Sequence, residues 1–262
     1  MAMPAIATRG RTLQRLSGHL CLLLSLLYLL PAHAMDIDEL MTHIDRLWRG
    51  DTSQATMTMT VKTRRYERTM TMEAWSRGKD YSLVVIREPI KDRDIATLKV
   101  AENIWNYLPK INRVTKVPAS MMSGSWMGSH FTNDDLVKES TYVDDYDSEI
   151  SFEGERDGIL VYEVTSLPKP DAAVVWGRVM MTIRQDNFAP LTATYFDEEG
   201  VLIRVMQFDD IREIDGRAIP MRMTLIPEDK PGESTVVEYA YIAFGMELAE
   251  NFFSLQGLKQ RH

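Results

Sequence analysis

The segment of residues 123–136 contains the residue types that hydrolytic catalysis would need. It reads Ser-Gly-Ser-Trp-Met-Gly-Ser-His-Phe-Thr-Asn-Asp-Asp-Leu, so serines, His130, Asp134 and Asp135 lie close together in sequence. A nucleophile elbow places its serine at the centre of G-x-S-x-G, between a strand and a helix. Ser125 comes one position too early for that pattern, and the strand–elbow–helix context is missing. We therefore predict no catalytic site and no enzymatic activity.

Histidines and methionines are the candidate metal ligands. Two of the five histidines fall within residues 1–34, and the others are His43, His130 and His262. No H-x-x-E or C-x-x-C spacing is present. Soft thioethers bind Cu(I), and four methionines are spaced two apart on two predicted strands: Met57, Met59, Met70 and Met72. Methionine is also a flexible apolar lining. We favour the lining, because no histidine or cysteine lies beside these residues, and predict no metal and no cofactor.

The segment of residues 123–136 is better suited to covering an apolar space. Trp126, Met127 and Phe131 are large apolar side chains that are costly to leave in water. Gly124 and Gly128 interrupt any strand and would act as hinges on which the segment swings. The polar residues 132–135 can cap a helix that continues through residue 137. The alternative is a glycine-rich crossover loop whose tryptophan closes the end of a core.

An interior rich in methionine and aromatic residues would suit acyl chains. Methionine and threonine alternate in residues 56–61, and methionine alternates again in residues 68–75, where Ala74 shares its face and Trp75 has the opposite parity. The predicted lining and lid of an apolar ligand cavity are Met57, Met59, Met70, Met72, Trp105, Tyr107, Trp126, Met127 and Phe131. A closed core without a ligand is the alternative, because periodicity does not separate the two.

Residues 1–34 have the features of a secretory signal peptide. Three arginines precede an apolar run at residues 20–30, which is too short to span a bilayer comfortably. Ala32 and Ala34 then give the small-x-small pattern of a cleavage site. The only cysteine, Cys21, lies inside the apolar run and not at a lipoprotein cleavage point. We predict removal of residues 1–34 and a single periplasmic domain at residues 35–262; an uncleaved anchor is the alternative.

The charge of the chain limits its partners. Of the 30 Lys and Arg residues, three fall in residues 1–34, which contain none of the 38 Asp and Glu. The remainder therefore has 27 basic and 38 acidic residues, a formal charge of −11. Nucleic-acid binding requires a basic surface, so we predict no nucleic-acid partner. The same balance disfavours firm electrostatic attachment to anionic lipid. We expect a monomer.

Residues 36–48 are predicted to form an amphipathic helix. Asp36 can cap its start, with Glu39 at the capping-box position. Apolar residues recur at helical spacing through Trp48, and Gly50 is placed to end the helix. This helix is expected to lie on a sheet.

Beyond residue 50 the apolar period changes to two, which indicates antiparallel strands with one buried face. The predicted strands are residues 56–61, 68–75, 81–88, 95–100, 104–108, 111–117, 148–153, 160–165, 174–184, 191–196, 202–208, 219–226 and 235–244. Glu-Gly at 199–200 and Asp-Gly at 215–216 predict tight hairpins. Such a large sheet must curl, close or split. A short helix at residues 247–255, with Phe252, Phe253 and Leu255 inward, is predicted to close the chain.

The leader, the first helix and the run of strands resemble the LolA/LolB superfamily. The string Ser-Trp-Met-Gly-Ser-His-Phe-Thr-Asn-Asp-Asp-Leu at residues 125–136 resembles the LolA-like outer membrane lipoprotein-sorting branch. The resemblance covers essentially the whole chain after residue 34. It implies a mainly β fold with flanking helices: a half-open antiparallel β-barrel with helices acting as a lid.

The resemblance also implies a function. Proteins of this kind shield the acyl chains of a lipoprotein or lipid in transit across the periplasm and accompany RND/MMPL-type or ABC-type inner-membrane exporters. The expected function is therefore a non-enzymatic periplasmic carrier. The alternative is a lipid-sensing or interaction module without transport activity. No cavity arginine of the carriers can be matched to a residue of this chain.

Overall fold

The structure, a computed structural model, describes Met1 and residues 35–138 and 141–260. The predicted signal peptide lies outside the described residues apart from Met1. Residues from Asp36 onward form one compact unit. Among the described helices, none has the length and apolar character needed to cross a membrane.

Strands dominate the described residues. They are β1 (Thr52–Lys62), β2 (Glu67–Arg77), β3 (Tyr81–Glu88), β4 (Ala96–Val100), β5 (Asn103–Leu108), β6 (Arg113–Lys116), β7 (Tyr146–Arg156), β8 (Ile159–Pro168), β9 (Arg178–Arg184), β10 (Pro190–Phe196), β11 (Leu202–Ile214), β12 (Arg217–Pro227) and β13 (Ser234–Phe244). The helices are α1 (Ile37–Arg46), α2 (Asn133–Lys138), α3 (Tyr142–Asp145) and α4 (Leu255–Gln260), with short 3₁₀ helices η1 (Ile90–Asp92), η2 (Pro109–Ile111) and η3 (Ala119–Met121). Each predicted strand overlaps one of these strands.

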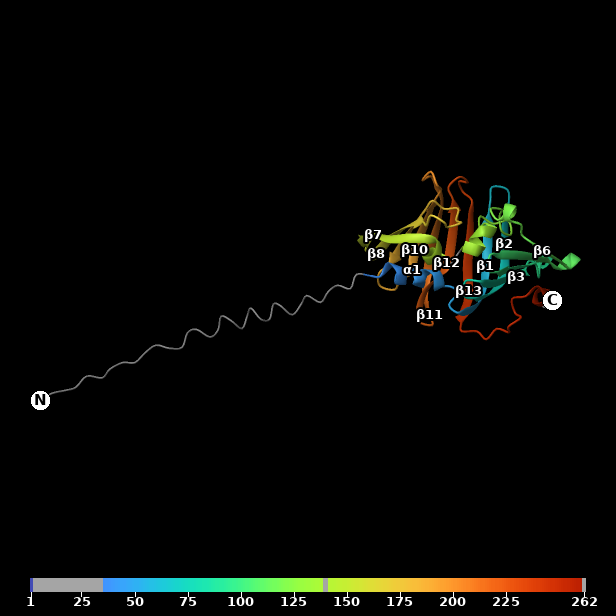
Figure 1. The fold of residues 1–262 in the computed structure, drawn as a ribbon, viewed down its shortest axis with the longest axis horizontal. Helices are drawn as coiled ribbons and strands as arrows, with labels where there is room; N and C mark the ends of the chain where they lie inside the picture. Colours follow the sequence, from blue (N-terminus) through green and yellow to red (C-terminus); the bar gives the residue numbers. More distant parts are fainter. Residues whose placement is uncertain (2–34, 139–140, 261–262) are drawn as a thin grey trace. The chain divides into compact units, whose positions relative to one another are not determined.

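The strands form a single antiparallel sheet in the order β6-β5-β4-β3-β2-β1-β13-β12-β11-β10-β9-β8-β7. In the described chain β6 and β7 are its two edges, so the sheet does not close on itself. Figure 1 shows β2, β3 and β6 on one side of β1 and β13, and β7 to β12 on the other. This confirms the predicted half-open antiparallel barrel.

Helix α1 packs on the inner face of this sheet. Its N-cap is Asp36, whose carboxylate accepts hydrogen bonds from the amides of Asp38 and Glu39. Leu47, just after the helix, joins a buried cluster with residues of β1, β12 and β13. The Trp48 indole N–H donates to the Pro220 carbonyl at 3.2 Å. The predicted helix therefore lies on the sheet as expected.

The methionines of β1 and β2 face each other across the strand pair. Met57 is opposite Met72, and Met59 is opposite Met70. Met59, Met70 and Met72 are fully buried, whereas Thr58 and Thr71 pair on the other face. The alternation read from the sequence thus sets which face of the sheet is buried.

The outer face of β2 to β5 carries a second core. Trp75 has the outward parity and packs with Leu83, Leu98 and Tyr107. The C-terminal segment covers them with Phe253 and Leu258. Figure 1 shows this segment returning to the side of β3.

The prediction for the C-terminal helix was wrong in its position. Residues 247–254 form no helix, with turns at residues 250–253, and α4 begins at Leu255. Leu255 is 43% exposed, while Phe253 is 7% exposed. Phe253 packs into the outer cluster and so holds this irregular segment on the sheet. A single buried side chain needs no helical spacing, so the segment need not be a helix.

We predict that Met70→Ala lowers the free energy of unfolding by about 2–5 kcal/mol, because it opens a cavity at a fully buried position. Urea unfolding monitored by circular dichroism measures this change. Thr71→Ala, one residue along on the opposite face, is the control and should cost less than about 1 kcal/mol. Equal losses in the two variants would contradict the assignment of the buried face.

Candidate functional site

A cavity of about 210 Å³ lies between the inner face of the sheet and the segments that cover it. Its apolar floor comes from strands on both halves of the sheet: Ala55, Met57, Ala74, Val84, Met181, Ala193, Met206, Phe208, Met223 and Val237. Its cover comes from α1, α2, α3 and two loops: Ile44, Trp48, Trp126, Phe131, Leu136, Tyr142, Val174 and Trp176. The polar residues at its wall include Asp134, Asp135, Lys138 and Arg204. The site is an apolar space with a small charged region.

Three of the residues proposed from the sequence line this cavity: Met57, Trp126 and Phe131. Met59, Met70 and Met72 are buried in the same layer but are not among the lining residues. Trp105 and Tyr107 lie on the face turned away from the cavity. Tyr107 belongs to the outer cluster, and Trp105 pairs with Leu98 of that cluster. Alternation along β5 places both on the outer side.

Residues 123–138, called here the lid segment, form a compact loop that leads into α2. The Trp126 amide donates to the Phe131 carbonyl at 2.8 Å, and the Ser129 amide donates to the Trp126 carbonyl at 2.9 Å. The side-chain amide of Asn133 donates to the carbonyls of Met121 and Gly124. These bonds give the lid segment a defined shape of its own.

The two glycines of the lid segment occupy different environments. Gly128 has a φ of +75° and follows Met127 at +51°, so the chain turns sharply there in the left-handed region. A Cβ on Gly124 would lie 3.0 Å from the Met121 carbonyl oxygen. Gly124 is therefore required by close packing, and Gly128 by backbone conformation.

Trp126 anchors the lid segment to the sheet. Its side chain is 6% exposed, and its indole N–H donates to the Thr97 hydroxyl on β4 at 3.1 Å. The Thr97 hydroxyl donates in turn to the side-chain carbonyl of Asn106 on β5. A buried indole that finds a hydrogen-bond partner is both apolar cover and polar anchor.

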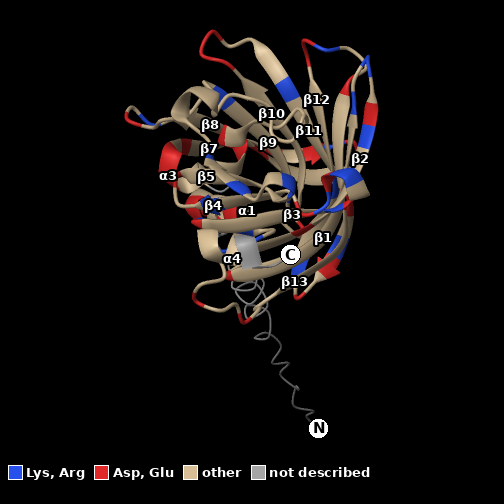
Figure 2. Cartoon of the chain, turned by 90° about the vertical axis from the view of Figure 1, so that its right-hand side faces the viewer, with Lys and Arg blue, Asp and Glu red and all other residues tan. Residues whose placement is uncertain are grey.

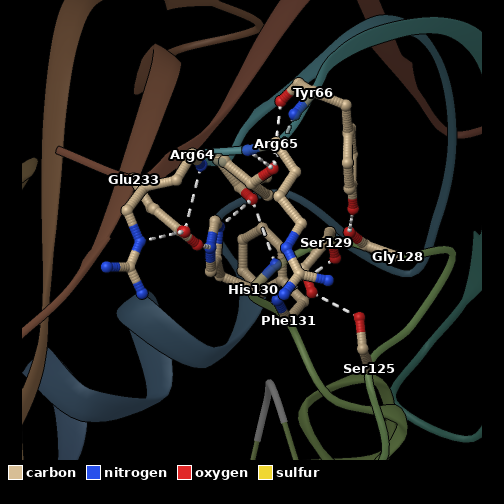
Figure 3. Close-up of polar contacts among 11 residues, drawn as sticks. Arg64, Arg65, Tyr66, Ser125, Gly128, Ser129, His130, Phe131 and Glu233 are labelled. Carbon is tan, nitrogen blue, oxygen red and sulfur yellow. Dashed lines mark hydrogen bonds and ion pairs between the residues drawn. The ribbon is translucent and has the colours of Figure 1, made fainter. Parts of the chain in front are cut away.

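His130 anchors the other end of the loop (Figure 3). Its ring contacts the Thr235 hydroxyl at 2.9 Å and the Glu233 carboxylate at 3.1 Å, and its amide donates to Thr235. Glu233 also accepts from the Arg64 amide, and these contacts lower the pKa of the Glu233 carboxyl. The Tyr66 hydroxyl donates to the Gly128 carbonyl at 2.9 Å. His130, one of the residue types that hydrolytic catalysis would need, thus holds the lid segment to the strand ends.

Asp135 joins α2 to the floor of the cavity. The Thr132 amide donates to its carboxylate at 2.7 Å, and its own amide donates to the Thr132 hydroxyl at 3.1 Å, which is the reciprocal pattern of a capping box. The same carboxylate accepts two bonds from the Arg204 guanidinium on β11, at 2.7 and 2.8 Å. One carboxylate therefore starts the helix and fixes it to the sheet.

Arg204 lies in an aromatic surrounding. Its guanidinium is 4.4 Å from the ring centres of Trp176 and Tyr195, and its side chain is 7% exposed. Burial lowers the pKa of Arg204, but the attraction of the Asp135 carboxylate and its hydrogen bonds hold that pKa above the ordinary value. Burial also raises the pKa of the Tyr142 and Tyr195 hydroxyls, which hydrogen-bond each other at 3.0 Å. The charged pair is thus enclosed by neutral aromatic groups.

The role of Arg204 escaped the sequence analysis. Arg204 shares strand parity with Met206 and Phe208, so the pattern placed a charge on the buried face of β11. That mismatch is the signal that could have found it, because a buried charge requires a partner. Its partner Asp135 is 69 residues away in sequence.

Helix α3 is held to α1 by Asp45. Its carboxylate accepts from the amides of Tyr142 and Val143, each at 3.1 Å. Burial raises the pKa of Asp45 to about 6, although the two amide bonds oppose the shift.

Within the described residues, no group of three or more His, Cys, Asp or Glu is placed to hold a metal ion.

Comparison with known proteins connects this architecture to a family. A family model described as "-like: Uncharacterized protein" matches residues 78–260, more than half of the chain. The chain belongs to this family. No curated protein matches its sequence.

Three solved structures share the fold of this chain. A DUF1329 family protein from Desulfovibrio piger has a TM-score of 0.77 and 24% identity, over 84% of this chain and 97% of that one. A domain from Vibrio parahaemolyticus described as an outer membrane lipoprotein-sorting protein has a TM-score of 0.72 and 22% identity, with the same coverage. A LolA superfamily protein from Nitrosomonas europaea has a TM-score of 0.72 and 20% identity, over 86% of this chain and 100% of that one. The resemblance to the LolA superfamily is confirmed as a shared fold.

We predict that Asp135→Asn lowers the free energy of unfolding by about 3 kcal/mol, because it leaves the buried Arg204 charge without its counter-ion. Urea unfolding measures the loss, and hydrogen exchange should show faster exchange of the α2 amides. Arg212→Gln, which removes the exposed ion pair with Asp210, is the control and should cost less than about 1 kcal/mol. Similar effects in both variants would mean that the Asp135 pair does not hold α2.

We predict a pH dependence from Asp45. Because folding raises its pKa from 3.8 to about 6, its protonated form favours the folded state. The stability it adds is fully present below pH 3.8 and is lost as the pH rises through about 6. Asp45→Asn should flatten the curve of unfolding free energy against pH in this window, and Asp38→Asn, at an exposed site, should not. An unchanged slope in Asp45→Asn would refute the shift.

Proposed function

We propose that this protein is a non-enzymatic periplasmic carrier that encloses the acyl chains of a lipid or lipoprotein in the cavity under the lid segment. The apolar floor on the inner face of the sheet, roofed by Trp126 and Phe131, is the observation that carries the proposal. The fold shared with a LolA superfamily protein supports it. Each methylene moved from water into such a space contributes about 0.8 kcal/mol.

The size of the cavity indicates that the lid segment must open during loading. Its volume of about 210 Å³ is smaller than the roughly 300–1,000 Å³ of sites that bury drug-sized ligands. A whole acyl chain therefore requires the lid segment to move away from the floor. We propose that Gly124 and Gly128 serve as its hinges and that the Asp135–Arg204 pair is the contact that opens.

The cost of opening also explains how a carrier would release its cargo. Acyl chains in a dry cavity would leave very slowly if nothing opposed their binding. Breaking the buried Asp135–Arg204 pair opposes loading, so part of the binding energy is consumed. We further propose that an inner-membrane exporter of RND/MMPL or ABC type supplies the cargo, and that residues 1–34 direct the chain to the periplasm and are removed.

The experiment that tests the carrier is native mass spectrometry of the full chain, as processed by the cells that produce it, followed by lipid extraction. We expect a co-purifying acylated molecule. A clean apo mass, together with no uptake of added fatty acid, would overturn the carrier. A lipid-sensing module would bind lipid but fail to pass it to acceptor membranes, so a transfer assay between labelled vesicles separates the two.

We predict that a fatty acid brominated on its chain quenches the fluorescence of Trp126. The test uses two variants that share Trp48→Phe, Trp75→Phe and Trp176→Phe. One also carries Trp105→Phe and retains Trp126, which lines the cavity; the other carries Trp126→Phe and retains Trp105, on the outer face.

Quenching is expected only in the variant that retains Trp126, because bromine quenches only at close range. Equal quenching in the two variants, or none in either, would exclude Trp126 from the acyl-chain site. Circular dichroism confirms that both variants are folded.

A further inference from the structure

Two neighbouring hairpin tips expose large aliphatic side chains. Ile90, in the loop between β3 and β4, is 79% exposed, and Ile111, in the loop between β5 and β6, is 64% exposed. Ala96 at the start of β4 pairs with Tyr107 near the end of β5, so both loops leave the sheet at the same end, side by side. Leu108, at the base of the second loop, is also exposed.

Basic residues flank both isoleucines. Lys91 and Arg93 follow Ile90, and Lys110 and Arg113 flank Ile111. Two of the three acidic residues in residues 88–95 pair with arginines of the sheet, and the third is Glu88. Asp92 pairs with Arg68 at 2.9 Å, and Asp94 pairs with Arg87 at 2.8 Å. The four basic side chains beside the isoleucines therefore dominate the local charge.

These basic tips contrast with the chain as a whole, whose formal net charge is −8. Lys62 of β1 pairs with Ser234 of β13, and Arg204 of β11 pairs with Pro227 of β12. The loops of residues 197–201 and 228–233 therefore lie at the same end of the sheet as the two tips. They contain Asp197, Glu198, Glu199, Glu228, Asp229 and Glu233. The basic tips and the acidic loops thus occupy different positions along one end of the sheet. Figure 2 shows both Lys or Arg and Asp or Glu around β2 and β3.

We propose that the tips of residues 88–95 and 108–113 dock the protein on a membrane surface rich in anionic phospholipid. Ile90 and Ile111 enter the headgroup layer, while Lys91, Arg93 and Lys110 contact lipid phosphates. Apolar side chains and basic residues on one surface are the combination that favours interfacial binding. The net charge of the chain disfavours attachment to anionic lipid. Only the tips contact the bilayer, however, so their local charge decides the binding.

A bilayer fits these tips better than a protein partner does. Protein interfaces need a broad surface with close shape complementarity. Here the apolar groups are single side chains on separate projecting loops, and a fluid headgroup layer accepts such side chains without matching their shape. Two side chains give weak, reversible binding, which suits a protein that must leave the membrane again. Docking at these tips requires no bound cargo and is therefore independent of the cavity.

The test is co-sedimentation of the full chain with vesicles of phosphatidylethanolamine and phosphatidylglycerol, compared with phosphatidylcholine alone. The N-terminus of every variant is checked by mass spectrometry, so that all are processed alike. We expect binding only to the anionic vesicles. Ile90→Ser/Ile111→Ser and Lys91→Gln/Lys110→Gln should each weaken binding about tenfold.

The control variant is Leu160→Ser/Leu167→Ser, which removes two equally large exposed leucines on β8. It should bind as the unchanged chain does. Equal binding to both vesicle types, or equal loss in the control and the isoleucine variant, would overturn the proposal. Unchanged vesicle binding in the isoleucine variant would also overturn it, and would point to a protein partner if that variant lost function in cells.

Discussion

The Asp135 carboxylate, buried against the Arg204 guanidinium, is the interaction on which the arrangement of the cavity depends. It completes the capping box of α2 by accepting from the Thr132 amide, and it accepts both bonds of the arginine. The guanidinium in turn lies over Trp176 and Tyr195. Removing either charge would leave the other desolvated and unpaired. Helix start, lid position and aromatic wall are therefore coupled through one ion pair.

The lid segment is fixed by three contacts that come from different parts of the sheet. Trp126 bonds to β4, His130 bonds to the start of β13, and Asp135 bonds to β11. Because these strands lie far apart in the sheet order, the lid segment spans the inner face from one half to the other. Opening the cavity must therefore break polar contacts, and not only apolar packing. That requirement gives a carrier a way to balance tight binding against release.

The half of the sheet formed by β1 to β6 uses both of its faces. Its inner face contributes to the cavity, and its outer face carries the cluster around Tyr107 that the C-terminal segment covers. Its loops at one end carry Ile90, Ile111 and the basic residues beside them. The net charge of the chain conceals these basic tips, because acidic residues outnumber basic ones over the whole chain. Cavity, stabilising core and docking surface thus occupy three separate surfaces of one half-sheet.

The sequence by itself determined the antiparallel strands, the N-terminal helix with its Asp36 cap and the alternation of the methionines along their strands, because these follow from local periodicity and capping chemistry. The resemblance of residues 125–136 to the LolA-like branch predicted the half-open barrel, which the structure confirms. Only the tertiary structure decided which side chains meet. Tyr107 was predicted to contribute to the cavity, but alternation along β5 turns it to the outer face. Periodicity also assigns a residue to a face and not to a partner. Arg204 and Asp135, distant in sequence, become one ion pair only when β11 and α2 are brought together by the curvature of the sheet.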